Sequence, residues 1–229
     1  RQVMLLKTKS LMTAFGGLKA IDKVDFELPA GEIRGIIGPN GSGKSTFFNL
    51  VSGVYDPDPG SYIEFDGHDI TNEPPHKIGA LGLSRTFQLL RLYQDMSVIN
   101  NVMSGYHTRV KYKFFDAVIG RKKIWDQEKE IKDEMMELLS FVGLADYAEL
   151  NASELSGGQR RLLVLARAIA MKPKLLMLDE PAAGLSPVNV DNLMKIIMQL
   201  KDKYGLTLII IEHILKVVMD TCNTVTVLD

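Results

Sequence analysis

Short apolar segments alternate with amphipathic ones along most of the chain. Residues 24–28 alternate between apolar and charged side chains, which predicts a strand with one exposed face. Residues 33–37 form a more continuous apolar strand, and the turn at 66–67 lies between further apolar positions and predicts a hairpin. We therefore expect antiparallel and parallel strands together in the first part of the chain.

A helical pattern replaces the strands between about residues 89 and 153. The apolar positions that recur here at helical spacing, with charges between them, are Ile131, Met135, Leu138, Leu139 and Val142. This stretch predicts a helical insertion.

After Ser156, which suits a helix N-cap, helices and strands alternate to the end of the chain. The pattern predicts a helix to about Met171, strands over 175–178 and 207–211, a helix over about 187–204, and a short final helix and strand. Strands that alternate with helices predict a parallel sheet that binds its ligands at the carboxyl ends of the strands.

Length and charge narrow the class of protein. A chain of 229 residues is compatible with one α/β domain carrying an insertion, which we favour, or with two small domains. Its net charge of −1 gives no global electrostatic attraction to nucleic acid or anionic lipid. Cys222 is the single cysteine, which excludes an intrachain disulfide and fits a reducing compartment. No apolar run reaches the length of a membrane-spanning helix. The chain begins at Arg1 without a signal-peptide pattern, and we expect both ends to be trimmed.

A complete phosphate-loop motif follows the strand over 33–37. Its glycines let successive backbone N–H groups converge on phosphate oxygens, the lysine supplies a positive charge at the β/γ end, and the serine after it supplies a hydroxyl for Mg²⁺. The alternative is a glycine-rich turn with a solvated lysine, but the strand before the motif and the helix after it favour the phosphate loop. The residues are Gly38, Pro39, Asn40, Gly41, Ser42, Gly43, Lys44, Ser45 and Thr46.

Two carboxylates follow the buried strand at 175–178. Asp179 is suited to hold Mg²⁺ through its water shell, and Glu180 to orient the attacking water and accept its proton. Alone, such a pair more often marks only the point where a strand leads into a loop.

Gln88 and His213 also follow strand-like segments, so we expect them at the same edge of the sheet as Lys44.

A second phosphate-seeking segment lies ahead of the helix that begins after Ser156. A glycine pair at a helix start presents bare N–H groups and the positive end of the helix dipole, which suits an anion. Two such loops in one chain suggest that each handles a different nucleotide, and that two copies meet. The residues are Leu155, Ser156, Gly157, Gly158 and Gln159.

In order and spacing, these motifs resemble those of the nucleotide-binding subunit of an ATP-binding cassette (ABC) transporter. The resemblance covers essentially the whole chain. It implies a P-loop NTPase core with a mixed sheet, an N-terminal antiparallel β subdomain and an inserted α-helical subdomain. It also implies a single domain over 1–229, with the insertion at about 89–155, that binds ATP and Mg²⁺ and hydrolyses ATP.

The resemblance also assigns roles. It implies that residues 38–46 are the Walker A loop, Leu155 to Gln159 the signature, Asp179 and Glu180 the Walker B pair, and His213 the switch histidine. Gln88 becomes the Q-loop residue, expected to act in catalysis and to bind the metal. Phe15 is expected to stack on adenine; the alternative is a core phenylalanine beside two flexible glycines.

In that family two nucleotide-binding domains pack head to tail, so Ser156, Gly157 and Gly158 would contact the γ-phosphate held by the partner. The implied partners are membrane-spanning permease subunits, a second ATPase subunit and an extracytoplasmic solute-binding protein, with the chain on the cytoplasmic face of the membrane. Residues 82–88, about 106–130 and 182–187 resemble ATPase subunits of branched-chain amino-acid importers. Ser186 departs from the commoner family pattern, which has aspartate there.

Two other functions stay open at this point. One is a soluble ABC ATPase acting on nucleic acid or ribosomes, but such proteins usually carry paired cassettes or long coiled coils, which this chain lacks. The other is a regulatory module with little hydrolysis, against which Glu180 and His213 argue. The stretch 111–125 interleaves basic and aromatic residues. It is interpreted first as a packed helical insertion facing membrane subunits, then as a solvated connector, and last as a nucleic-acid surface.

Overall fold

The computed structural model describes residues 3–86, 92–107 and 121–229, with the backbone alone for 107 and 121–127, and divides into two compact units. The first unit joins Arg1–Gln88 to Lys174–Asp229, and the second is Leu89–Pro173. Gln88 and residues 111–120 of the basic and aromatic stretch lie outside the described residues. The single domain with an insertion at about 89–155 stays a prediction.

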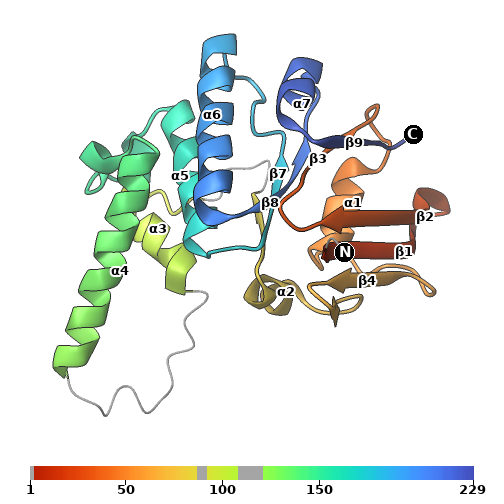
Figure 1. Ribbon diagram of the computed structural model, residues 1–229, viewed down its shortest axis with the longest axis horizontal. Coiled ribbons are helices and arrows are strands. Elements are labelled where there is room, and N and C mark those ends of the chain that lie inside the picture. Colours follow the sequence, from red (N-terminus) through yellow and green to blue (C-terminus); the bar gives the residue numbers. More distant parts are fainter. Residues whose placement is uncertain (1–2, 87–91, 108–120) are drawn as a thin grey trace. The chain divides into compact units, whose positions relative to one another are not determined.

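An antiparallel sheet opens the first unit (Figure 1). In the described residues it has four strands in the order β2-β1-β4-β5. The turn between β1 and β2 is made by Gly16 and Gly17, whose φ angles of 54° and 88° suit a two-residue hairpin turn. The strands are β1 (Met4–Phe15), β2 (Leu18–Pro29), β4 (Tyr62–Phe65) and β5 (His68–Asp69).

A separate parallel sheet forms the rest of the unit's strands, in the order β6-β7-β8-β3-β9 among the described residues. Every pairing in it is parallel, so the two strand types occupy two sheets rather than one mixed sheet. Parallel strands need long crossover connections, whereas antiparallel neighbours can be joined by short hairpins, so the two kinds of strand form separate sheets. The strands are β3 (Ile33–Ile37), β6 (Leu83–Thr86), β7 (Leu175–Asp179), β8 (Thr207–Ile211) and β9 (Thr224–Val227).

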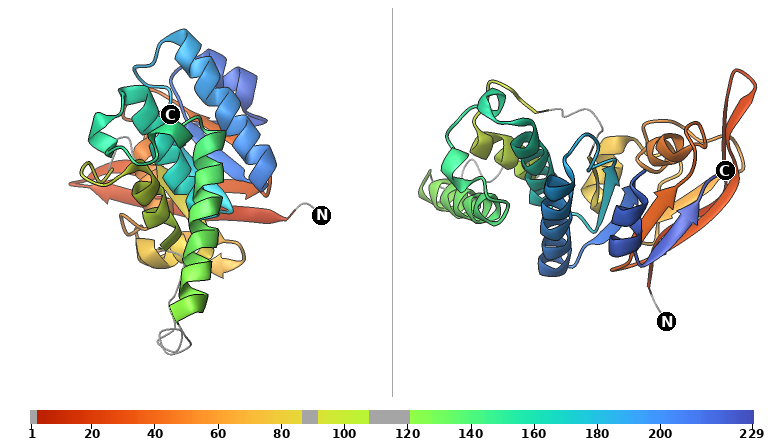
Figure 2. Two further views of the ribbon diagram at one scale, coloured as in Figure 1. Left: turned by 90° about the vertical axis from the view of Figure 1, so that its left-hand side faces the viewer. Right: turned by 90° about the horizontal axis from the view of Figure 1, so that it is seen from above.

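Helices cover both faces of the parallel sheet. Met177 and Ile209 belong to the same buried cluster as Phe47 and Phe48 of α1 (Lys44–Val51). The residues next to Met177 in β7 and next to Ile209 in β8 point to the other face of the sheet, because side chains alternate along a strand. Figures 1 and 2 show α6 (Pro187–Tyr204) and α7 (Leu215–Thr221) on that face. The short α2 (Pro75–Leu81) leads into β6.

The second unit is helical, as the spacing predicts. Met135, Leu138, Leu139 and Val142 are each at most 2 % exposed. A Cβ on Gly105 would lie 2.3 Å from the carbonyl oxygen of Arg167, so this glycine permits the close approach of two helices. The unit contains α3 (Val98–His107), α4 (Arg121–Phe141), η1 (Ala145–Tyr147), η2 (Ala152–Glu154) and α5 (Gly157–Ala170).

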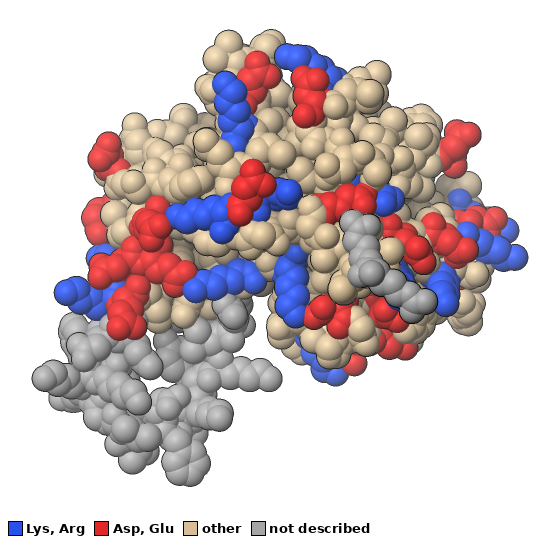
Figure 3. Space-filling model, viewed as in Figure 1, with Lys and Arg blue, Asp and Glu red and all other residues tan. Residues whose placement is uncertain are grey.

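Neither the distribution of surface charge nor the apolar character of the helices departs from what the composition predicts. On the face drawn in Figure 3, acidic and basic side chains of the described residues are interspersed. Among the described residues, no helix combines the length and apolar character that crossing a membrane requires.

Candidate nucleotide site

The phosphate loop joins β3 to α1 in the predicted order of strand, loop and helix. Gly43 has a φ of 89°, and a Cβ there would lie 2.4 Å from the carbonyl oxygen of Ala20. A Cβ on Gly38 would lie 2.1 Å from the carbonyl oxygen of Leu228. Both positions therefore accept only glycine without displacement of neighbouring backbone.

Lys44 folds back over this loop. Its Nζ donates hydrogen bonds to the carbonyl oxygens of Gly38, at 2.8 Å, and Pro39, at 2.7 Å, and the residue is 6 % exposed. These two bonds hold a positive charge beside the N-terminus of α1. No side chain caps that terminus, and the first turn of α1 has no acidic residue. The loop thus places N–H groups and the Lys44 ammonium together, and neither a capping side chain nor an acidic residue in the first turn of α1 balances their positive charge.

The Ser42 hydroxyl gives an independent test of whether the loop fits a phosphate. Its Oγ is buried and has no hydrogen-bond partner in the part of the chain that the structure describes. A buried hydroxyl without a partner costs free energy, which an acceptor such as a phosphate oxygen would recover. The loop residues therefore fit an anionic ligand.

The acidic pair lies at the carboxyl end of β7, in the same sheet. Asp179 is 6 % exposed, and burial raises the pKa of its carboxyl, while Arg85 and Lys44 act in the opposite direction. Arg85 Nη2 donates to Asp179 Oδ2 at 3.1 Å, and Arg85 Nη1 donates to Asn49 Oδ1 at 2.6 Å. A carboxylate is thus kept beside the phosphate loop by a cation from β6.

Glu180 and His213 lie together at the ends of two neighbouring strands. His213 Nε2 is 2.7 Å from Glu180 Oε1, and the backbone N–H of Glu180 donates to the carbonyl oxygen of Ile211 at 2.9 Å. Glu180 also adopts a left-handed φ of 48°, which is unusual for a residue other than glycine. This backbone turn directs the second carboxylate toward the histidine instead of along β7.

Phe15 ends β1 at the tip of its hairpin. It is 49 % exposed, so the alternative of a core phenylalanine is wrong. Its ring meets the ring of Tyr55 edge to face, with the centroids 5.4 Å apart. Tyr55 is itself 41 % exposed, so the two rings form an exposed aromatic pair.

The signature segment belongs to the second unit. The predicted N-cap is confirmed: Ser156 Oγ accepts from the backbone N–H of Gln159, and Gln159 Oε1 accepts from that of Ser156. A Cβ on Gly157 or Gly158 would meet nothing within 4 Å. Packing within the described chain therefore gives no reason for this glycine pair.

Two charged residues near the site escape the sequence reasoning. Arg85 could have been noticed as a cation inside a short strand, where a buried charge needs a partner. Glu212 directly precedes His213 and is 2 % exposed. A charged residue directly after the apolar run 208–211 was the available signal for it. Gln88, by contrast, lies outside the described residues, so its placement stays a prediction.

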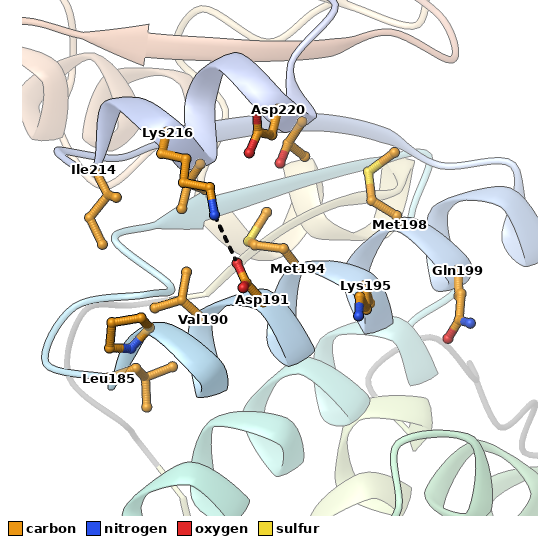
Figure 4. Close-up of a pocket in the computed structure, with 13 residues that line it drawn as sticks. Leu185, Val190, Asp191, Met194, Lys195, Met198, Gln199, Ile214, Lys216 and Asp220 are labelled. Atoms are coloured by element: carbon orange, nitrogen blue, oxygen red, sulfur yellow. Dashed lines mark ion pairs between the residues drawn. The ribbon is translucent and has the colours of Figure 1, made fainter.

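A hollow of about 650 Å³ lies elsewhere in the first unit, between α6 and α7 (Figure 4). Its walls are mainly apolar and include Leu185, Met194 and Ile214. Lys216 Nζ and Asp191 Oδ1 approach to 3.7 Å across it. None of the phosphate-loop residues lines this hollow.

The fold and the site together define a P-loop nucleotide-binding protein of the α/β class. A family model described as "ABC transporter" matches residues 21–183, and the chain therefore belongs to the ABC transporter family. It is an ATP-binding subunit of such a transporter and hydrolyses ATP to power transport. The fold prediction, with its antiparallel N-terminal sheet, P-loop core and helices, is confirmed.

Individual relatives agree with this family. The chain is 42 % identical over 219 residues to the probable branched-chain amino acid transport ATP-binding protein LivG of Archaeoglobus fulgidus, covering 94 % of this chain and 82 % of the relative. It is 37 % identical over 225 residues to the high-affinity LivG of Escherichia coli strain K12, covering 98 % and 88 %. The crystal structure of the ADP conformation of MJ1267, an ATP-binding cassette of an ABC transporter, matches with a TM-score of 0.84 and 32 % identity, covering 99 % of this chain and 87 % of that one.

Proposed function

We propose that the protein binds ATP with Mg²⁺ and energises the import of branched-chain amino acids through membrane-spanning permease subunits. The observation that carries the ATPase part is the meeting of Lys44, Asp179, Glu180 and His213 at one edge of the parallel sheet. The solute is supported by the names of the relatives, which are branched-chain amino acid transport proteins.

The phosphate loop supplies the binding energy for the triphosphate. Backbone N–H groups of residues 38–46 and the Ser42 hydroxyl donate to its oxygens, and Lys44 exchanges its loop carbonyls for the β- and γ-phosphates. Phe15 stacks on the adenine, and its exposure at the hairpin tip supports this role.

Ser45 and Asp179, with Gln88, are the residues we propose to hold Mg²⁺. Hydroxyl, amide and carboxylate oxygens are the donors this ion prefers, and it usually keeps several waters and phosphate oxygens besides one or two carboxylates. When bound, Mg²⁺ neutralises charge on the β- and γ-phosphate oxygens.

Glu180 is the proposed general base for the attacking water. Its carboxylate lies at the end of a buried strand and contacts His213, which is placed to stabilise charge on the γ-phosphate. Gln88 follows the last described residues of β6 and is proposed to act in catalysis at the same edge.

The signature is proposed to complete the site of a second ATPase subunit. Ser156, Gly157 and Gly158 form an exposed helix start, followed by the half-buried Gln159, and its glycines have open space around them, which suits the approach of a partner's γ-phosphate. ATP would therefore be bound between two subunits, and hydrolysis would be linked to their association.

The remaining partners are proposed by the same reasoning. The chain would sit on the cytoplasmic face of the membrane against the permease subunits, and an extracytoplasmic solute-binding protein would deliver the solute. The helical second unit is the proposed contact with the permease subunits.

The test is ATP hydrolysis by the purified protein and by its complex with copurified permease subunits. Glu180→Gln is expected to lower kcat by about 10²–10⁴-fold, the usual effect of removing a positioned base, with ATP affinity retained. Lys44→Ala is expected to weaken ATP binding itself. Glu149→Gln, at an exposed position in the second unit, is the matched control. Near wild-type hydrolysis by Glu180→Gln would refute the assignment.

Uptake of leucine, isoleucine and valine into vesicles that contain the complex, with the proposed solute-binding protein supplied, tests the solute separately. We expect ATP-dependent uptake of these amino acids and none of an acidic amino acid. A complex that hydrolyses ATP but takes up none of the three would leave the ATPase assignment standing and overturn the solute.

A further inference from the structure

Glu212 is a buried carboxylate between two loops of the proposed active site. Its Oε1 accepts the backbone N–H of Ala182 at 2.7 Å, and its Oε2 accepts the backbone N–H of His213 at 3.2 Å. A charge that is 2 % exposed is costly unless it is hydrogen-bonded, and bonds to a carboxylate are stronger than neutral ones. These two bonds therefore hold both N–H groups at defined positions.

Each of the two N–H groups belongs to a loop that carries a proposed catalytic side chain. Ala182 is two residues after Glu180 and is fully buried. His213 follows Glu212 directly. The direct contact between the side chains of Glu180 and His213 lies at an exposed position, so solvent competes with it, whereas the bond from Ala182 to Glu212 is buried and the bond from His213 is partly buried.

The hydrogen bonds between β7 and β8 align the two loops where they begin, up to the bond from the Glu180 N–H to the Ile211 carbonyl oxygen, but packing beyond the loops adds little. The chain passes from one loop into α6 and from the other into α7, and both helices line the hollow of about 650 Å³ (Figure 4). The ion pair of Lys216 with Asp191 across the hollow is 71 % and 59 % exposed, so it contributes little. Beyond the ends of the two strands, the buried bridge is therefore a stronger link between the loops than this ion pair.

We infer that Glu212 is a positioning residue for ATP hydrolysis, which sets the separation of Glu180 and His213 and passes movements of the loop 182–186 on to His213. The inference rests on the proposed roles of Glu180 and His213. It predicts an effect on the chemical step with little effect on ATP binding, because the side-chain hydrogen bonds described for Glu212 lead to the loops of Glu180 and His213 rather than to the phosphate loop.

The decisive variant is Glu212→Gln, which keeps the shape of the side chain but replaces one acceptor oxygen by a donor. We expect kcat to fall about tenfold to a hundredfold, since misplacing a reacting group by about 1 Å has an effect of that order, with KM for ATP unchanged within about twofold. Thr207→Val is the matched control, because Thr207 is a buried residue at the other end of β8 whose Oγ1 accepts the N–H of Gly31.

A double-mutant cycle with His213→Ala separates positioning from general stability. If Glu212 acts through His213, Glu212→Gln should lower kcat by less than about twofold in the His213→Ala background. An equal loss in both backgrounds, or a wild-type kcat for Glu212→Gln, overturns the inference.

One further variant, Glu212→Asp, and the single variant His213→Ala give the remaining outcomes. Glu212→Asp retains the charge but is too short to reach both N–H groups, so a folded Glu212→Asp protein with wild-type kcat also overturns the inference, even if Glu212→Gln fails to fold. Full activity of His213→Ala would instead remove the proposed role of His213. Loss of activity in His213→Ala together with wild-type kcat in Glu212→Gln leaves the proposed function intact and removes this inference alone.

Discussion

Arg85 and Asp179 form a buried ion pair that joins β6 to β7, with Nη2 and Oδ2 3.1 Å apart and side chains only 7 % and 4 % exposed. The same guanidinium reaches Asn49 and lies 5.4 Å from the ring centroid of Phe48, both on α1. Arg85 thus ties the proposed metal-binding carboxylate to the helix that follows the phosphate loop.

Replacing Arg85 by methionine should therefore be strongly destabilising. Removing one member of a buried pair leaves the other charge uncompensated, so we expect the free energy of unfolding in urea to fall by about 3–5 kcal/mol. In the Arg85→Met, Asp179→Asn double variant the loss should be smaller than the sum of the two single losses. A decrease below about 1 kcal/mol for Arg85→Met would show that the pair contributes little to stability.

The two central glycines of the phosphate loop offer a matched comparison. Gly41 and Gly43 share a φ of 89°, but a Cβ on Gly41 meets nothing within 4 Å, whereas one on Gly43 meets the carbonyl oxygen of Ala20 at 2.4 Å. Gly41→Ala should lower the free energy of unfolding only by the cost of a left-handed conformation for a residue with a Cβ, about 1–2 kcal/mol. Gly43→Ala should lower the unfolding midpoint further and weaken ATP binding more, as measured by calorimetry. Equal effects would exclude the close contact as the reason for Gly43.

Ser156→Arg tests the proposed role of the signature. Bulk and charge at this helix start should prevent ATP-driven dimerisation while ATP still binds, measured by size-exclusion chromatography in a Glu180→Gln background. Ser156→Ala is the comparison without added bulk, because it removes the N-cap hydrogen bond, worth about 1 kcal/mol, together with the proposed hydroxyl contact to the partner's γ-phosphate. Dimerisation of the arginine variant at wild-type level would contradict the proposal.

The buried thiol of Cys222 should affect both its own reactivity and the pH dependence of the free energy of unfolding. Burial raises the pKa of its thiol from 9.0 to about 11, so at pH 8 we expect its labelling by a disulfide reagent to be about tenfold to a hundredfold slower in the folded than in the unfolded protein. Between these pKa values the folded state binds more protons than the unfolded state, so the free energy of unfolding falls as the pH rises through this range.

Cys222→Ala provides the control for that pH dependence. The variant lacks this titration, so its unfolding free energy should fall less steeply than that of the wild type between about pH 9 and pH 11. Parallel curves for the two proteins would mean that the thiol does not contribute.

Local sequence determined the phosphate loop, because strand, turn and helix follow one another directly and only glycine fits the left-handed turn at Gly43. Ser156 was likewise predicted as an N-cap from its immediate neighbours, and the structure confirms it. β1 was missed, since irregularities in its pairing with β2 interrupt the alternation by which strands are recognised.

Only the tertiary structure decided which charged groups meet. Arg85 and Asp179 are 94 residues apart in sequence, and Glu180 and His213 are 33 apart. Their pairing depends on strand order and register, in particular on Asp179 lying beside Ile211 in the parallel sheet. Glu212 gains its distant partner Ala182 in the same way. Hydrophobic patterning cannot reveal such pairs, because the pattern fixes which face of a strand is buried and not which strand becomes its neighbour.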